Sequence, residues 1–338
     1  MNRRDAILGL GATVTAMPLW LRAQPNESRK TRIIGSLSLL AWPTAEQYAN
    51  LPFFPAMKTH GWVEGTNFIM ERRHAEFRSE RLAGLAEDLV RKRVDLILAF
   101  GPEATIAAAR ATRSIPIMFS NVVWPLEQGL IDSFARPGRN ITGISFYTGV
   151  EVSNKRLEYL RAVAPAARRL SWLWPSDYAE TLSGGRFDMA PVMEAGARSL
   201  GFETRFHDIR KPEDIGPALD EIRAWPAQAL SASSEYVAAS GQRVAEFALR
   251  ERLPSAFPAR INVEAGGLLF YGPSGAEGAR MLSRYVSYVD RILRGAQPGE
   301  LPVERPSQYE LVINLKTAKA LNLKIPQELL IRADRVIE

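Results

Sequence analysis

The chain has 338 residues, of which 46% are hydrophobic and 24% are charged, and its formal net charge is +6. This is the composition of a globular protein with room for two domains of ordinary size. The absence of cysteine excludes disulfide bonds, thiol catalysis and cysteine-ligated zinc. The basic residues are scattered along the chain, which favours a solvated surface over a nucleic-acid-binding face.

Residues 1–23 have the layout of a signal peptide. Arg3 and Arg4 precede an apolar run over residues 6–21, and the small residue Ala23 follows, which indicates cleavage near this position after export by a twin-arginine-like route. The alternative is a structural first helix, which the glycines and the proline of this stretch weaken. The later sequence contains no run of about 18 uncharged apolar residues, so it predicts no membrane span.

Strands and helices alternate in the first half of the chain. Residues 32–40 and 66–73 read as strands, and residues 79–93 read as an amphipathic helix. Residues 94–100 and 115–121 read as two further strands, which are joined by an Ala-rich helix. Strands that alternate with helices of this length predict a parallel sheet with right-handed crossovers.

The same alternation restarts after a Gly-, Pro- and Asn-rich segment at residues 135–149. The sequence therefore predicts an α/β fold with two Rossmann-like lobes, each built on a parallel sheet, joined by a hinge that the chain crosses more than once. A second boundary, at residues 261–275, is followed by a tail that is too small for a third domain, and we expect this tail to return to the first lobe.

The sequence contains no recognisable catalytic constellation. Its three histidines share no metal-ligand spacing, and neither a nucleophile elbow nor a lysine-containing phosphate loop is present. We therefore predict that the protein is not an enzyme and has no cofactor and no metal site. An enzyme that acts on a small molecule in the cleft between the two predicted lobes remains the alternative from a different functional class.

The strand ends provide the candidate binding site. Ligands of open parallel sheets bind outside the carboxyl ends of the strands, and pockets concentrate where two domains meet. In lobe 1 we expect the ligand-binding residues to be Leu40, Trp42, Phe100, Gly101, Pro102, Glu103, Asn121, Trp124 and Tyr147. In lobe 2 we expect them to be Trp174, Pro175, Ser233, Ser234 and Arg260.

Some of these residues suggest particular roles, each with an alternative. Trp42 and Trp124 could form apolar walls or could pack as ordinary rim aromatics. The helix that opens at Pro102 favours a ligand anion, whereas Glu103 in its first turn would repel an anion or pair with an ammonium group. Arg260 could clamp a ligand carboxylate or could be a surface arginine.

Five segments of the sequence, at residues 60–76, 81–101, 115–145, 263–272 and 301–326, carry a resemblance that extends in order over almost the whole mature chain. They resemble the substrate-binding proteins of ABC transporters of the tryptophan/tyrosine-uptake type. The resemblance implies a type I periplasmic binding protein fold and a periplasmic protein that delivers a small solute to an ABC permease in the inner membrane. It also implies the bounds of the parts: residues 31–143 and 272–338 for lobe 1, residues 150–262 for lobe 2, and residues 144–149 and 263–271 for the hinge.

The sequence departs from this family's pattern at two turns. Gly101-Pro102-Glu103-Ala104 stands where members often have Gly-Thr-Pro-Ala, and Trp124-Pro125-Leu126 stands where they often have Asp-Pro-Val. Polar positions have thus become Glu103 and Trp124, which favours an apolar or aromatic ligand.

Together these observations predict the periplasmic solute-binding component of an ABC uptake system, in which two lobes close around a small ligand that is aromatic or apolar and resembles a carboxylate or an amino acid. We expect a monomer without a nucleic-acid partner. The alternative is a ligand sensor that presents its closed form to a membrane receptor. The sequence leaves the identity of the solute open.

Overall fold

The computed structural model describes residues 31–41, 44–122, 124–145, 149–174, 181–186, 188–233, 237 and 240–338. These residues form two sheets flanked by helices, one sheet with five strands and one with seven among the described residues. Most strand pairs are parallel, which confirms the predicted α/β fold. The predicted signal peptide lies outside the described residues.

The five-stranded sheet is parallel throughout, with the strand order β2-β1-β3-β4-β5. The apolar runs in the sequence predicted four of these strands, because buried parallel strands need apolar side chains on both faces. The five strands are β1 (Arg32–Ser38), β2 (Phe68–His74), β3 (Leu96–Phe100), β4 (Ile117–Ser120) and β5 (Ile141–Ile144).

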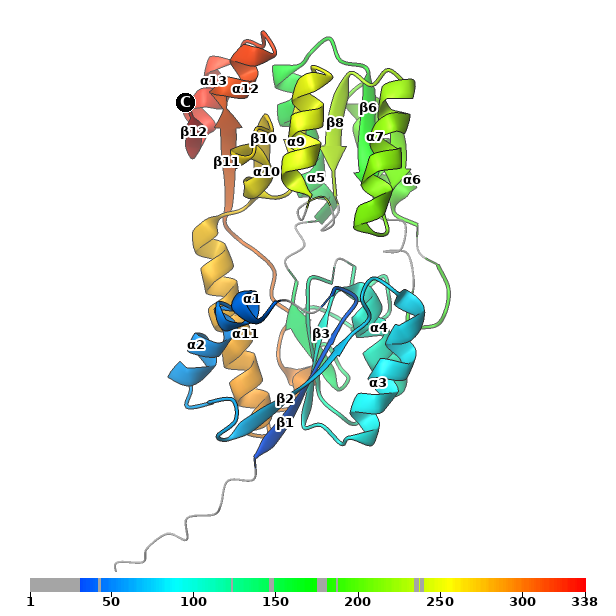
Figure 1. The fold of residues 1–338 in the computed structure, drawn as a ribbon, viewed down its shortest axis with the longest axis vertical. Helices are drawn as coiled ribbons and strands as arrows, with labels where there is room; N and C mark the ends of the chain where they lie inside the picture. Colours follow the sequence, from blue (N-terminus) through cyan, green and yellow to red (C-terminus); the bar gives the residue numbers. More distant parts are fainter. Residues whose placement is uncertain are drawn as a thin grey trace, which may run out of the picture. The chain divides into compact units, whose positions relative to one another are not determined.

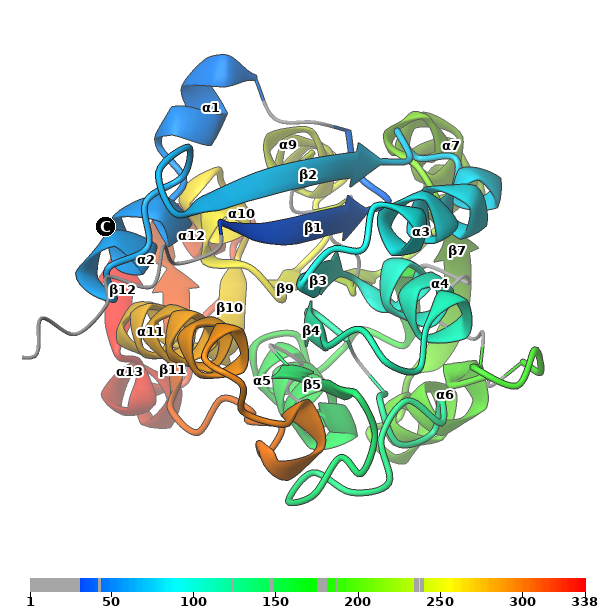
Figure 2. The same cartoon turned by 90° about the horizontal axis from the view of Figure 1, so that it is seen from below.

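Different helices cover the two faces of the five-stranded sheet. Figures 1 and 2 both show α3 and α4 on one side and α2 and α11 on the other. Alternate residues of β1 accordingly join different cores: Leu37 packs with the α3 and α4 face, and Ile34 packs with the α2 and α11 face. The helices of this sheet are α1 (Ala45–Ala49), α2 (Phe53–Thr59), α3 (Leu82–Arg91), α4 (Pro102–Ala111) and α11 (Gly275–Leu293).

The seven-stranded sheet has the order β12-β11-β10-β9-β8-β6-β7. Its strands are β6 (Arg169–Trp174), β7 (Glu203–Asp208), β8 (Ala229–Ala232), β9 (Ser255–Phe257), β10 (Leu269–Pro273), β11 (Tyr309–Asn314) and β12 (Arg335–Ile337). Its helices are α5 (Gly149–Val163), α6 (Ala190–Ser199), α7 (Ile215–Ala224), α9 (Gly241–Arg250), α10 (Arg260–Glu264), α12 (Leu315–Ala320) and α13 (Gln327–Arg332).

The strand pairing corrects the predicted assignment of the C-terminal segment. We expected residues 272–338 to complete lobe 1, but β11 and β12 pair in the seven-stranded sheet, where β11 lies antiparallel to β10. Within this segment, α11 does pack on the five-stranded sheet. A strand pattern shows that a segment is extended and buried, but it does not show which sheet will receive it, because pairing depends on the path of the preceding chain.

The predicted boundaries also contain regular structure. β5 lies within the segment that we read as a linker, and it pairs with β4 through the register Ile117↔Ile141. β10 overlaps the predicted hinge at residues 263–271 and is an internal strand of its sheet. Gly and Pro residues around short strands concealed both of them. The division into two lobes and a hinge at residues 144–149 otherwise stays a prediction.

The chain leaves β10 through α11 and returns to β11, and these two crossings lie side by side. Ser274 donates a backbone hydrogen bond to Gln308 at 3.0 Å. Glu277, which has no exposed surface, accepts a hydrogen bond from the backbone of Ser307 at 2.6 Å and two from the Arg280 side chain at 2.8 Å. The hydrogen bonds from Arg280 are the main cause that lowers the pKa of Glu277 to about 2.

Candidate functional site

A pocket of about 420 Å³ lies at the carboxyl ends of β1, β3 and β4. Four of the predicted residues line it, namely Leu40, Phe100, Gly101 and Asn121. They meet because parallel strands end at one edge of the sheet, so residues that follow different strands become neighbours there. Tyr48, Phe53, Phe54 and Tyr285 also line the pocket, and we call it the aromatic pocket.

Small side chains on one face of the sheet leave the space for this pocket. Ser36 and Ser38 of β1 and Ser120 of β4 all line it and are 4–7% exposed. Closer to the other end of the strands, large side chains such as Ile34 and Met118 fill the corresponding space beneath α2 and α11. Serine at positions where a core would place Leu or Ile therefore creates a hollow between the sheet and these helices.

Aromatic rings form one wall of the aromatic pocket. The ring centroids of Phe53 and Phe54 lie 5.4 Å apart with an interplanar angle of 84°, and those of Tyr48 and Phe54 lie 4.6 Å apart. The Tyr285 ring lies 6.3 Å from Phe53 and 6.5 Å from Phe100. Such edge-to-face and tilted pairs hold each ring in place, so the wall is preorganised for another flat apolar group.

A polar network anchors this wall to β2. The Tyr48 hydroxyl donates to Glu64 Oε2 at 2.7 Å, and Arg72 donates to both Tyr48 and Glu64. The Arg72 guanidinium also lies 4.5 Å from the centroid of the Tyr48 ring. Burial and the hydrogen bond to Glu64 raise the pKa of Tyr48 to about 12. The hydroxyl is thus a neutral hydrogen-bond donor at ordinary pH.

The lining of the aromatic pocket is uncharged. None of the described residues that line it is Asp, Glu, Lys or Arg. Burial, aided by the charge of Arg72, lowers the pKa of the lining residue His74, whereas a hydrogen bond with the backbone of Leu40 acts in the opposite direction. His74 is therefore neutral at pH 7, and the pocket suits an uncharged group.

Two backbone positions at the pocket edge need unusual conformations. Gly101 has φ 87°, which glycine adopts without strain, and it is the residue before α4. Asn121 has φ 59° in the left-handed region that asparagine tolerates better than most residues. The prediction that Pro102 opens α4 is confirmed. These turns bring the chain sharply away from β3 and β4 and leave the strand ends open.

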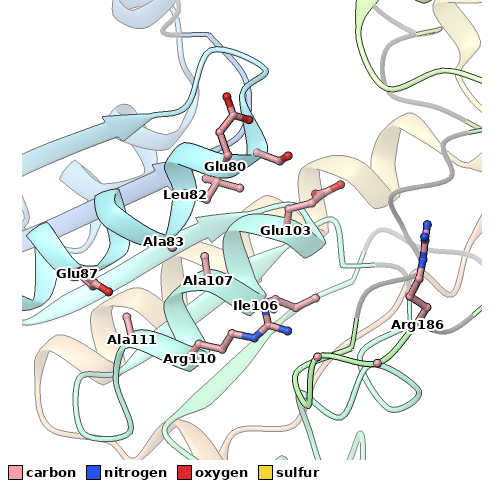
Figure 3. A pocket seen from close by; sticks show the side chains of 13 residues that line it. Glu80, Leu82, Ala83, Glu87, Glu103, Ile106, Ala107, Arg110, Ala111 and Arg186 are labelled. Carbon is pink, nitrogen blue, oxygen red and sulfur yellow. The ribbon is translucent and has the colours of Figure 1, made fainter.

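Glu103 lies in a different pocket, on the α3 and α4 side of the sheet. That pocket has a volume of about 600 Å³, and Glu80, Glu103, Arg110 and Arg186 are among the residues that line it (Figure 3). Glu103, in the first turn of α4, is not among the residues that line the aromatic pocket, and its contact with a ligand stays a prediction. Pro102 is buried and Trp124 is 8% exposed, and neither lines the aromatic pocket.

The predicted residues of the second sheet already have partners. Trp174 packs against Phe206 at 5.6 Å between ring centroids, and Ser233 accepts a hydrogen bond from the indole of Trp172 at 2.8 Å. Arg260 lies 3.4 Å from carboxylate oxygens of both Glu264 and Glu310. Their contact with a ligand stays a prediction. Trp42, Tyr147, Pro175 and Ser234 lie outside the described residues.

Sequence reasoning missed several residues that line the aromatic pocket. Tyr48, Phe53 and Phe54 belong to short helices that follow the first strand, and His74 ends β2. The cluster of aromatics at residues 48–54 was a usable signal. Tyr285 gave none, because a tyrosine on the buried face of a long amphipathic helix reads as ordinary core.

A serine, a histidine and a glutamate lie in the order of a catalytic triad in the seven-stranded sheet. Ser171 Oγ lies 3.0 Å from His207 Nε2, and His207 Nδ1 lies 3.0 Å from Glu221 Oε2. Ser171 has no exposed surface and His207 is 1% exposed, so a substrate cannot reach the serine hydroxyl. Burial is the main cause that lowers the pKa of His207. We interpret the three groups as a structural network.

Among the helices that the structure describes, none combines the length and the hydrophobicity of a membrane-spanning segment. The described residues also contain no group of three or more His, Cys, Asp or Glu side chains that could hold a metal ion.

Comparisons with known proteins identify similar chains. The sequence model of the family described as ABC transporter substrate binding protein matches residues 52–337. A curated tyrosine-binding protein from Clostridioides difficile (strain R20291) is 24% identical over 299 residues, which cover 88% of this chain and 83% of that protein.

Solved structures show a similar fold. A conserved domain protein from Vibrio cholerae has a TM-score of 0.77 and 23% identity, covering 91% of this chain and 100% of that one. An ABC domain from Streptococcus pneumonia in complex with L-Trp has a TM-score of 0.74 and 20% identity, with the same coverage of both chains.

Proposed function

Because the chain belongs to the ABC transporter substrate-binding protein family, we propose that it captures a small aromatic solute in the aromatic pocket. The observation that carries this proposal is the lining of the pocket, which combines several aromatic rings with small hydroxyl groups and no charged side chain. Its volume of about 420 Å³ lies in the range of small-molecule sites. The names of the relatives, one tyrosine-binding and one in complex with L-Trp, support an aromatic ligand.

Because the pocket is uncharged, we expect the ring of an aromatic amino acid to bind inside it and the charged groups to lie outside it. Its ring would enter the pocket and pack on Phe53, Phe54 and Phe100. Its charged groups would stay outside, because an ionised carboxylate or ammonium group without a partner is costly to bury. The residues predicted at the ends of the other sheet, Trp174, Ser233 and Arg260, are then candidates to meet those charged groups. For this Arg260 would have to exchange a carboxylate partner.

We further propose that residues 1–23 direct export to the periplasm and that the loaded protein, as a monomer, delivers its solute to an ABC permease without a catalytic step. The two-lobed fold supports closure around the ligand, since a ligand that binds the closed form more tightly shifts the protein toward it. Presentation of that closed form to a membrane receptor, rather than to a permease, would use the same binding event.

Isothermal titration of the purified protein tests the proposal, after co-purified ligand has been removed by unfolding and refolding. We expect L-tyrosine, L-tryptophan or L-phenylalanine to bind with a Kd near the micromolar range, which corresponds to about 8 kcal/mol. L-leucine, L-glutamate and a hexose should bind far more weakly. Tight binding of the hexose or of L-glutamate, with no binding of the aromatic amino acids, would contradict the proposal.

A further inference from the structure

Tyr285 is a buried phenol on α11 that lines the aromatic pocket. Its side chain is 5% exposed, and among the described residues its hydroxyl has no hydrogen-bond partner. Burial without such a partner raises the pKa of Tyr285, so the hydroxyl stays protonated. It can therefore both donate and accept a hydrogen bond. A buried hydroxyl that finds no partner is destabilising, so packing alone does not account for a tyrosine at this position.

A second buried tyrosine on the same helix, Tyr288, has a structural role and provides a comparison. Tyr288 is 3% exposed, and its hydroxyl donates to the backbone oxygen of Pro302 at 2.9 Å. Burial and the neighbouring Glu304 raise its pKa to about 12. The two side chains are alike in type and depth and lie one turn apart. They differ in that the protein supplies a partner for the Tyr288 hydroxyl, whereas Tyr285 lines the pocket and its buried hydroxyl has no partner among the described residues.

The surroundings of Tyr285 restrict which kind of ligand atom could form a hydrogen bond with its hydroxyl. Phe53 and Phe100 flank its ring at centroid distances of 6.3 and 6.5 Å, so the neighbouring part of a ligand must be apolar. No described residue that lines the pocket is acidic or basic, and the lining residue His74 is neutral. A charged group would lose its hydration there without compensation. The partner must thus be an uncharged hydrogen-bonding atom attached to an apolar ring.

We propose that Tyr285 is a specificity-determining residue, whose hydroxyl selects ligands that carry an uncharged hydrogen-bonding atom on their ring. A phenolic hydroxyl and an indole N–H share this chemistry, and an unsubstituted phenyl ring lacks it. The inference rests on the proposed function, because it requires the ligand ring to enter the aromatic pocket. It adds that the Tyr285 hydroxyl distinguishes ligand rings that carry a polar atom from rings that do not.

Two matched ligand pairs test this proposal on the wild-type protein. L-tyrosine and L-phenylalanine differ by the hydroxyl, and L-tryptophan and benzothienyl-alanine differ by replacement of the N–H with sulfur. Isothermal titration should show that the polar member of at least one pair binds about tenfold more tightly, because its ring atom satisfies Tyr285. The pair that shows the difference identifies the ring. Equal Kd values within both pairs would overturn the inference without any variant.

The variants Tyr285→Phe and Tyr288→Phe form a matched comparison. In Tyr285→Phe the preference for the polar ring should disappear, through about tenfold weaker binding of that ligand and little change for its apolar partner. Tyr288→Phe should keep the preference. The melting temperature of Tyr285→Phe should equal or exceed that of the wild type, whereas that of Tyr288→Phe should fall.

The outcomes separate this inference from the proposed function. If the aromatic ligands bind and Tyr285→Phe changes both members of a pair equally, Tyr285 contributes packing alone: the inference is wrong and the proposed function stands. If the wild type binds none of the four compounds, the proposed function and the inference fail together.

Discussion

Two buried polar side chains of the seven-stranded sheet have hydrogen-bond partners, whereas at the edge of the five-stranded sheet buried polar side chains line an open pocket. Ser171 and His207 are buried and form a continuous set of hydrogen bonds with the exposed Glu221. Ser36 and Tyr285 are also buried, but they face the aromatic pocket, and the Tyr285 hydroxyl has no partner within the described part of the chain. A catalytic-looking order of residues is therefore a weaker sign of function than a polar group that the fold leaves unsatisfied.

The largest effect should come from filling the pocket. In Ser36→Leu the larger side chain would occupy the space between β1 and α2, so we expect binding of the aromatic ligand to weaken by about 100-fold or more. Urea denaturation distinguishes this loss of binding from unfolding of the variant, because overpacking should lower the free energy of unfolding by no more than about 3 kcal/mol. Ser36→Ala is the control, since it keeps the space and should change the Kd less than threefold. Unchanged affinity of Ser36→Leu would place the ligand elsewhere.

Breaking the hydrogen-bond network of the seven-stranded sheet should lower stability and leave ligand binding unchanged. His207→Ala removes the central member and leaves buried Ser171 without its partner, so the free energy of unfolding should fall by about 2 kcal/mol. The Kd of the aromatic ligand should stay within a factor of two. Urea denaturation and isothermal titration measure the two quantities on the same preparation. A loss of binding without a loss of stability would instead assign this network to function.

Acid should destabilise the folded protein in a pH range set by two histidines, the partly buried His74 and the buried His207. Burial lowers the pKa of both His74 and His207 below the ordinary value of 6.5. As the pH falls below 6.5, the unfolded chain binds protons that the folded protein does not, so stability decreases. Each histidine contributes a slope of at most about 1.4 kcal/mol per pH unit.

Urea denaturation between pH 7.5 and 5.0 measures this slope, in a range above the ordinary pKa of carboxyl groups. The slope should be smaller in His207→Ala, which lacks one of the two groups. A flat profile in the wild type would show that neither histidine is protected from protonation.

The sequence predicted the strands whose ends form the pocket, and with them Leu40, Phe100, Gly101 and Asn121. Apolar runs and the Gly-Pro helix start are local patterns, so they can be recognised without knowledge of tertiary contacts. The place of Tyr285 in the pocket could not be predicted, because this residue belongs to a helix far along the chain. A helical pattern shows that such a residue is buried, but it does not show whether it faces packed side chains or a cavity.

The tail shows a second limit of prediction. The patterns of β11 and β12 were visible as extended segments, but their place in the seven-stranded sheet depends on the path through α11. The place of Glu103 in the first turn of α4 could be predicted from the sequence, but which pocket its side chain lines depends on packing.

The fully buried Glu277 has a mechanical consequence. It ties the start of α11 to Ser307 on the returning strand, beside the hydrogen bond between Ser274 and Gln308. The outgoing and returning segments are thus joined by hydrogen bonds at the start of α11 and just before β11. Because α11 also carries Tyr285, a movement of this helix on ligand binding would have to carry the segment before β11 with it or break these hydrogen bonds.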